Sequence, residues 1–181
     1  YYLFMNSRKI YYPGENLKES SKISPVDIYG KNKYLTERYL KKKIKNRLIS
    51  LRISNVIGKR FPINLRNNHK LFFDNFLKFR KSKKKIIVYD EFKDFISIKQ
   101  FSKIIYKIIK NKLTGTYNVS LGEKIYVSEI VKWLDPIFFK KVNFIKSSKN
   151  SFTLSNKKLL KKIKISIGKK ELKSFCKNLI R

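Results

Sequence analysis

Short apolar runs alternate with longer segments of helical periodicity along most of this sequence. The apolar runs that predict strands are at residues 1–5, 48–53, 86–89, 95–98, 115–119 and 142–145. Apolar side chains at helical spacing predict helices at residues 28–46, 71–79, 101–109 and 127–134, and two short basic helices between 156 and 181. Helices that connect successive strands are typical of a parallel sheet. The sequence therefore predicts an α/β fold, with a loop over residues 55–68.

The first apolar run, Tyr1-Tyr2-Leu3-Phe4-Met5, is continuous rather than alternating. This pattern is typical of a parallel strand that is buried on both faces, and such a strand needs neighbours. The chain also begins inside this run and without Met, so we expect it to be a piece of a longer protein.

Basic residues greatly outnumber acidic ones, because 45 Lys and Arg against 12 Asp and Glu give a net charge of +33. Such a balance suggests binding to nucleic acid or to an anionic membrane. The lysines occur in nearly every segment, however, whereas a binding face would concentrate them. The phenylalanines at 72, 73, 76 and 79 have helical spacing, which is more typical of a core than of a platform for bases. A solvated basic surface without a specific nucleic-acid partner is therefore the favoured interpretation.

The chain contains a single cysteine, Cys176, and a single histidine, His69. An internal disulfide is therefore excluded, and because no cysteine–histidine spacing for zinc exists, we predict no metal site. The unpaired cysteine indicates a reducing compartment, and we expect a cytoplasmic protein. No apolar run approaches the roughly 20 residues needed to cross a bilayer, so we expect no membrane span.

Tyr29 and Lys33 are the residues whose spacing most directly suggests chemistry. They are four positions apart at the start of the predicted helix, so their side chains share one helical face. A free tyrosine has a pKa of about 10, but a cation within about 4–6 Å favours the phenolate. The pair could therefore act as a general acid/base, although a Tyr-x-x-x-Lys match in so basic a sequence also arises by chance.

The surrounding segments make the chance explanation weaker. Residues 4–11 resemble a strand that ends in Ser-Ser-x-x-Val-Tyr-Gly, the pattern of the extended short-chain dehydrogenase/reductases that act on nucleotide sugars. This resemblance places the family's catalytic serine on Ser7. Residues 24–33, followed by Glu37, are similar to the family's Pro-x-x-x-Tyr-Gly-x-x-Lys segment, with Tyr29 and Lys33 in the catalytic positions.

Further segments follow in the family's order. Residues 51–58 resemble Leu-Arg-x-x-Asn-x-x-Gly, which implies that the backbone at Ser54 and Val56 reaches the nicotinamide while Asn55 faces the substrate. Residues 93–96 resemble Arg-Asp-Phe-Ile, with Lys93 in place of the arginine that would contact substrate phosphate. The strand at 115–119 and the segment at 155–160 are similar to Gly-x-Tyr-Asn-Val and Ser-Lys-x-x-x-Leu-Leu.

The resemblance implies the C-terminal half of a Rossmann-like doubly wound parallel sheet with a smaller α/β substrate domain. Residues 1–60 would form the second part of the NAD(P)-binding domain, and 61–181 mainly the substrate domain, with 86–110 returning to the first. The implied activity is epimerisation or dehydration of a nucleotide sugar with NAD or NADP, in a protein that is a homodimer when complete. Tyr29 would exchange a proton with a sugar hydroxyl, Ser7 would hydrogen-bond the same oxygen, and Lys33 would bind the nicotinamide ribose.

The chain also departs from the family pattern. The Gly-x-x-Gly-x-x-Gly loop that holds the cofactor pyrophosphate is missing from these 181 residues, and Tyr12 stands where the pattern has Gly. We therefore expect the isolated chain to be inactive. A 4-keto reductase of the same family, a catalytically dead remnant and, less favoured, a basic module that binds nucleic acid or a membrane surface stay open as alternatives. The favoured role of Glu37 is that of a surface partner for Lys41. The favoured role of Asp94 is that of a hydrogen-bonding loop residue.

Overall fold

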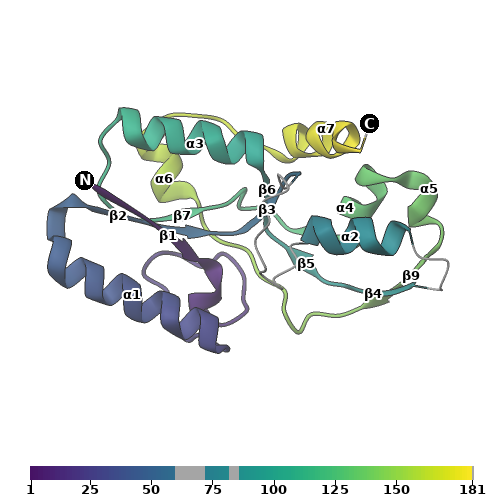
Figure 1. The fold of residues 1–181 in the computed structure, drawn as a ribbon, viewed down its shortest axis with the longest axis horizontal. Helices are drawn as coiled ribbons and strands as arrows, with labels where there is room; N and C mark the ends of the chain where they lie inside the picture. The colour runs from purple at the N-terminus through teal and green to yellow at the C-terminus, as the bar shows by residue number, and fades with distance from the viewer. Residues whose placement is uncertain (60–71, 82–85, 181) are drawn as a thin grey trace.

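The computed structural model describes residues 1–59, 72–81 and 86–180 (Figure 1). At its centre lies a three-stranded parallel sheet in the order β1 (Tyr2–Ser7), β2 (Leu48–Ile53), β7 (Gly115–Val119). Leu3 lies opposite Ile49 in the register of β1 and β2, and Leu51 lies opposite Tyr117 in that of β2 and β7. The predicted α/β fold with parallel strands is confirmed.

Helices cover both faces of this sheet. Helix α1 (Ile28–Ile44) lies on one face, and α3 (Ile98–Lys110) and α6 (Lys157–Ile163) lie on the other (Figure 1). Because side chains alternate along a strand, Ile49 and Leu51 of β2 pack in the core cluster that includes Ile104 of α3. Ser50 and Arg52 point the opposite way, toward α1. One face of β2 is thus apolar and the other polar, although both are buried.

The second region of the molecule has its own core, which is rich in phenylalanine. Its paired strands are β4 (Ile86–Asp90) with β9 (Val142–Lys146), which are parallel, and β5 (Phe92–Lys93) with β8 (Ile125–Tyr126), which are antiparallel. Its helices are α2 (Phe72–Arg80), α4 (Val127–Leu134), α5 (Pro136–Phe139) and α7 (Lys169–Leu179). Phe73 and Phe76 are buried in this core with Phe138, whereas Phe79 is 42% exposed. A parallel pair, β3 (Asn55–Ile57) and β6 (Phe95–Ser97), lies between the two regions (Figure 1).

The first strand differs from its prediction. In the described part of the chain β1 pairs with β2 alone and forms an edge of the central sheet, and Tyr2 and Met5 are 48% and 40% exposed. The expectation that it is buried on both faces is therefore wrong for these residues. An apolar run indicates that a strand is suited to burial. Whether the strand is buried depends on which strands and helices pack beside it in the sheet.

Most element boundaries agree with the sequence within a few residues, and the exceptions have local causes. Helix α1 ends at Ile44, because Lys45 has a positive φ of 51°, and a short 3-10 turn η2 (Lys45–Arg47) follows. Helix α3 starts earlier than predicted, at Ile98, because Ser97 and Gln100 form a reciprocal capping box. The predicted loop begins with strand β3, and its remainder from 60 to 68, like the predicted helix start at 71, lies outside the described residues.

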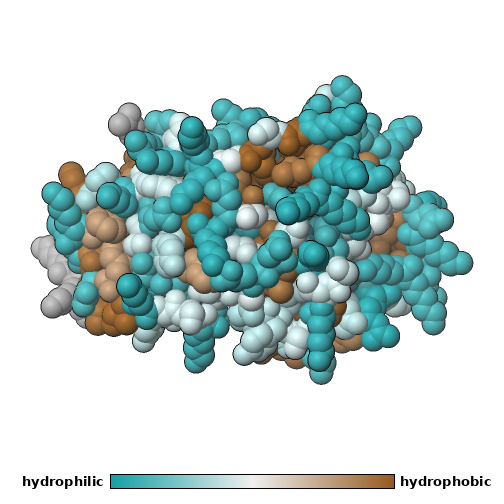
Figure 2. Space-filling model, turned by 180° about the vertical axis from the view of Figure 1, so that it is seen from behind, coloured by the Kyte–Doolittle hydropathy of each residue, from teal (hydrophilic) through white to brown (hydrophobic). Residues whose placement is uncertain are grey.

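The acidic side chains are too few to balance the basic ones, 12 against 45. Several of them form ion pairs within the fold, such as Asp27 with Lys9 at 2.6 Å and Asp135 with Arg80 at 2.7 Å. Hydrophilic side chains spread over most of the visible face rather than gathering in one patch (Figure 2). Among the described residues, the helices are all too short or too polar to span a membrane.

Candidate active site

Ser7 ends β1 and begins the 3-10 turn η1 (Arg8–Ile10). As the N-cap of this turn, its Oγ accepts a hydrogen bond of 3.2 Å from the backbone N–H of Lys9. A hydroxyl has one O–H donor and two lone pairs, so this bond uses acceptor capacity and leaves the proton available for donation. Ser7 therefore presents a hydrogen-bond donor at the carboxyl end of a parallel strand, the edge where α/β proteins bind their ligands.

The first turn of α1 packs directly against the backbone that follows Ser7. Asp27 caps the helix by accepting the Gly30 N–H at 2.7 Å, and its carboxylate also pairs with Lys9. These two hydrogen bonds, first that of Lys9 and then that of Gly30, lower the pKa of Asp27. A methyl group at Gly30 would lie 2.1 Å from the carbonyl oxygen of Lys9, so only glycine permits this approach. The neighbouring Tyr29 is thereby held beside the end of β1.

Lys33 connects the helix to the strand. Its Nζ donates a hydrogen bond of 2.7 Å to the carbonyl oxygen of Met5, and it lies 5.8 Å from the centre of the Tyr29 ring. Lys9 lies 5.7 Å from the centre of the same ring, so two cations are close to Tyr29. Partial burial lowers the pKa of Lys33. The side chains of Tyr29 and Lys33 thus meet at the end of β1 that carries Ser7, and Tyr29 remains 47% exposed to an incoming ligand.

Ser54, Asn55 and Val56 follow β2 at the same edge of the sheet. Ile53, the last residue of β2, lies opposite Ser7 in the strand register. Ser54 donates its backbone N–H to Val119 at 3.0 Å, yet its buried Oγ has no hydrogen-bond partner among the described residues. Asn55 donates its backbone N–H to the carbonyl oxygen of Asp94 at 3.2 Å. The predicted cofactor segment is thus adjacent to Ser7 along the sheet edge.

Lys93 lies in the second region, beside an apolar cavity of about 430 Å³. Phenylalanines of α2 and α5 and aliphatic side chains of β4 and α4 line the cavity, with Glu91 and Lys93 among its few charged groups. Lys93 pairs with Glu91 at 3.1 Å. Burial alone would raise the pKa of Glu91, but the Lys93 ammonium, followed by the hydrogen-bond donors of Asn150 and Ser147, lowers it. Ser7, Tyr29 and Lys33 do not line this cavity, so the predicted site residues fall into two groups.

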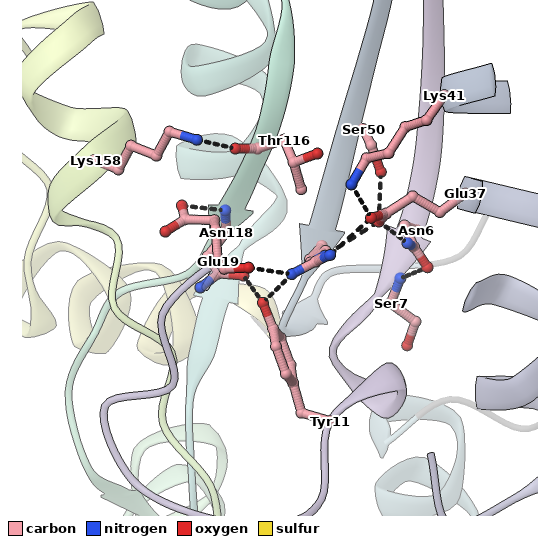
Figure 3. Close-up of polar contacts among 11 residues, drawn as sticks. Asn6, Ser7, Tyr11, Glu19, Glu37, Lys41, Ser50, Thr116, Asn118 and Lys158 are labelled. Atoms are coloured by element: carbon pink, nitrogen blue, oxygen red, sulfur yellow. Dashed lines mark hydrogen bonds and ion pairs between the residues drawn. The ribbon is translucent and has the colours of Figure 1, made fainter. Parts of the chain in front are cut away.

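Glu37 is buried, contrary to its expected place on the surface. Its side chain is 1% exposed, and it pairs both with Lys41 at 2.6 Å and with Arg52 at 2.7 Å (Figure 3). Burial alone would raise its pKa, but the hydrogen bonds and charge of Arg52, followed by those of Lys41, lower it to about 2. The expected Lys41 pair is present, but the surface location was wrong. The missed signal is Arg52 itself, because a charged residue inside an apolar strand requires a buried partner.

The Glu37–Arg52 pair is part of a polar network that runs from strand to strand across the sheet (Figure 3). Arg52 donates from Nη1 to the hydroxyl oxygen of Tyr11 at 2.6 Å, and Tyr11 in turn donates to the Asn118 Oδ1 at 3.0 Å. Burial raises the pKa of Tyr11 despite the opposing charge of Arg52. Asn6 of β1 also donates from its side-chain amide to Glu37, so the network joins β1, α1, β2 and β7 immediately below the carboxyl edge.

Asp94 joins the central sheet to later segments, in agreement with its expected role as a hydrogen-bonding loop residue. Its fully buried carboxylate accepts backbone N–H groups from Leu121 at 2.8 Å, Gly122 at 3.1 Å and Leu154 at 3.1 Å. Burial raises the pKa of Asp94 to about 7, against the effect of these donors. These hydrogen bonds connect the residue between β5 and β6 to the later segments at Leu121, Gly122 and Leu154.

Three solved structures of nucleotide-sugar enzymes share this fold. UDP-N-acetylglucosamine 4-epimerase from Methanobrevibacter ruminantium M1 has a TM-score of 0.75 and 19% identity, over 98% of this chain and 61% of its own. The dTDP-glucose 4,6-dehydratase of Bacillus anthracis str. Ames, in complex with NAD, has a TM-score of 0.73 and 14% identity, over 98% and 58%. The dTDP-4-dehydrorhamnose reductase of the same organism, in complex with NADP, has a TM-score of 0.69 and 21% identity, over 88% and 58%.

The present chain thus spans about three fifths of the length of these structures, 61%, 58% and 58% respectively. No curated protein sequence matches it. Residues 1–120, which contain Ser7, Tyr29, Lys33 and the Glu37–Arg52 pair, match the sequence model of the NAD dependent epimerase/dehydratase family. This match covers most of the 181 residues, and the chain therefore belongs to the NAD dependent epimerase/dehydratase family.

Proposed function

We propose that this chain carries the catalytic part of an NAD(P)-dependent enzyme that epimerises or dehydrates a nucleotide sugar, with Tyr29 as general acid/base. The observation that carries the proposal is the meeting of Tyr29 and Lys33 at the end of β1 that bears Ser7. Membership of the family supports it, as do similar structures whose descriptions include NAD or NADP.

The proposed proton transfer divides between the two hydroxyl groups. The free O–H of Ser7 would donate a hydrogen bond to an oxygen of the sugar and fix its position beside Tyr29. As a phenolate, which the positive charge of Lys33 would stabilise, Tyr29 would take the proton from that oxygen and become the neutral hydroxyl. In the reverse direction the Tyr29 hydroxyl would return the proton. The cofactor, when bound, supplies the hydride acceptor and donor for the sugar carbon.

The residues at the sheet edge fit a bound nicotinamide nucleotide. Lys33 uses one of its three ammonium protons on Met5, which leaves donors for the ribose hydroxyls. The Ser54 hydroxyl is buried beside this edge and has no hydrogen-bond partner in the described part of the chain, so it could bond a polar group of a ligand. The pyrophosphate is different, because these 181 residues lack the glycine-rich loop that holds it. We therefore propose that tight NAD(P) binding requires a segment outside this chain.

The substrate would extend from this edge toward the second region. Asn55, one residue beyond Ser54, is proposed to contact the nucleotide sugar. Lys93 can attract a phosphate as a point charge, although its present partner is Glu91. The division at residue 60 between cofactor and substrate parts, with 86–110 shared, and the homodimer are retained as proposals.

The decisive experiment is Tyr29→Phe in the complete protein that contains this chain, assayed with UDP- and dTDP-sugars. Removal of a general acid/base costs about 10²–10⁴-fold in kcat, whereas cofactor affinity should be unchanged. Tyr39→Phe is the matched control, because Tyr39 lies on the same helix, is 61% exposed and has its ring near Lys43, which has no proposed role. A loss smaller than tenfold in Tyr29→Phe would exclude Tyr29 as the acid/base.

Product analysis separates the alternatives within the family. An epimerase or dehydratase regenerates its cofactor in each cycle, whereas a 4-keto reductase consumes one NADPH for each sugar. Stoichiometric oxidation of added NADPH would therefore replace the epimerase or dehydratase assignment with the reductase. No turnover with any of these sugars by a folded, cofactor-bound protein would indicate a catalytically dead remnant.

A further inference from the structure

The carboxylate of Glu37 is surrounded by donors. Its Oε1 accepts from Lys41 Nζ and Arg52 Nη2, and its Oε2 accepts from Arg52 Nε at 3.1 Å, Ser50 Oγ at 2.9 Å and the side-chain amide of Asn6 (Figure 3). Glu37, Arg52 and Ser50 are all buried, so this arrangement has no solvent to rearrange into. The carboxylate is thus a fixed acceptor in the layer between α1 and the sheet.

This fixed acceptor determines which way the Asn6 amide points. An ionised carboxylate only accepts hydrogen bonds, so it must face the Asn6 NH₂ group. The Asn6 Oδ1 then faces the opposite direction, where it accepts the backbone N–H of Ser7 at 2.7 Å. Asn6 is itself buried, so neither end of the amide exchanges its partner for water. The position of the Glu37 carboxylate therefore fixes the Asn6 amide, and the Asn6 amide in turn holds the backbone N–H of Ser7.

Ser7 is then held at two points. Its N–H is bound to Asn6, and its Oγ accepts from the Lys9 N–H at 3.2 Å. With the backbone fixed and acceptor capacity of the hydroxyl in use, the Ser7 proton is the group left to meet a ligand. A hydroxyl held in this way needs little reorganisation when a sugar oxygen arrives, which is the condition for efficient catalysis by positioning.

We propose that Asn6 is a positioning residue, which couples the buried Glu37–Arg52 pair to the backbone of Ser7 and holds the Ser7 hydroxyl ready as a hydrogen-bond donor. The inference rests on the proposed function of Ser7 and adds a residue to it. In the pattern that residues 4–11 resemble, a serine occupies the position of Asn6. A serine side chain is one atom shorter, so it cannot place a donor on Glu37 and an acceptor on the Ser7 N–H at once.

The test compares Asn6→Ala with Ser50→Ala in the complete protein. Both variants delete a buried hydrogen bond to the same Oε2 of Glu37, but only Asn6 touches Ser7. We expect Asn6→Ala to lower kcat by about 10- to 100-fold, as small misplacements of catalytic groups do. KM and cofactor affinity should change less than twofold. Ser50→Ala should lower the unfolding midpoint similarly while kcat stays within twofold of the parent.

A double-variant cycle tests whether the effect passes through Ser7. If Asn6 acts by positioning Ser7, then Asn6→Ala should add almost nothing to the loss already caused by Ser7→Ala. Losses that multiply, or an equal loss of kcat in Ser50→Ala, would overturn the inference and leave Asn6 as a structural residue. Should Asn6→Ala fail to fold, Asn6→Ser replaces it with the same expectations.

The outcome for Ser7→Ala separates this inference from the proposed function. If Ser7→Ala and Tyr29→Phe both leave kcat unchanged, the proposed function falls and the positioning role falls with it. If those two variants are impaired but Asn6→Ala is not, the proposed function stands and the positioning inference alone is overturned.

Discussion

The two regions of the molecule are stabilised by different means. Between α1 and the central sheet the buried side chains include a charged pair, Glu37 and Arg52, which are 1% and 3% exposed. In the second region the corresponding space is filled by aromatic rings, and those of Phe76 and Phe138 meet edge to face at 5.5 Å. Packed aromatic rings can shift slightly and stay in contact, whereas the hydrogen bonds of a buried ion pair require a fixed orientation of both side chains. The rigid polar arrangement lies directly beneath the proposed catalytic edge, where fixed directions are useful.

Removing one member of the buried pair should produce the largest effect on stability. Arg52→Met leaves the Glu37 carboxylate in an apolar setting with Lys41 as its remaining cation, and breaking such a pair typically costs about 3–5 kcal/mol. Lys41→Met is the matched control, since Lys41 bonds the same carboxylate oxygen but is 47% exposed, and we expect a cost below about 1 kcal/mol. Urea denaturation at pH 7 measures both. Equal losses of stability in the two variants would show that it does not matter whether the cation paired with Glu37 is buried.

The cost of Arg52→Met should also depend on pH. The Glu37 pKa is about 2 in the folded protein, below its value of 4.5 in a free chain. A lowered pKa stabilises the fold fully above about pH 4.5, and this contribution is lost as the pH falls toward 2. The gap in stability between the parent protein and Arg52→Met should therefore narrow between pH 4.5 and pH 2. If the difference in stability did not change with pH, the charge of Glu37 would not contribute to the stability of the fold.

The aromatic core should respond to a comparable deletion without any dependence on pH. Phe76→Ala removes a buried ring that contacts Phe73 and Phe138, and such changes typically cost about 3 kcal/mol or more. Phe79→Ala, on the same helix but 42% exposed, should cost less than half as much. The two costs, measured by denaturation at pH 7 and across the same range from pH 4.5 to pH 2, should not change with pH. A pH-dependent cost for Phe76→Ala would erase the proposed contrast between the regions.

The same contrast explains what the sequence could predict. Strand β2 was predicted with the bounds that it has, Leu48 to Ile53, because a local apolar run encodes burial. The spacing of Tyr29 and Lys33 predicted that they share a helical face, and both approach the end of β1. The burial of Glu37 was missed because its partner Arg52 lies on another element, 15 positions away. Asn6 was missed because its role needs the simultaneous positions of a helix and two neighbours on the strand.

The smallest of the expected effects on stability concerns the contact that brings α1 to β1. Gly30→Ala would place a methyl group 2.1 Å from the Lys9 carbonyl oxygen, so the helix must shift, at a typical cost of about 1–3 kcal/mol. Gly14→Ala is the matched control, because its added methyl group would meet Leu17 at an ordinary distance of 3.5 Å. We expect the control to lie within about 0.5 kcal/mol of the parent.

The consequence for activity should exceed the consequence for stability. A shift of the first turn of α1 moves Tyr29 away from the strand end that bears Ser7, while the apolar core of the second region is untouched. In the complete protein we therefore expect Gly30→Ala to lose about 100-fold in kcat even where it is fully folded, since a displacement of 1 Å in a catalytic group has effects of that size. Measuring kcat and the unfolding midpoint on the same preparations decides the matter. If Gly30→Ala unfolds more readily yet turns over at the parent's rate, the close approach of α1 serves packing alone.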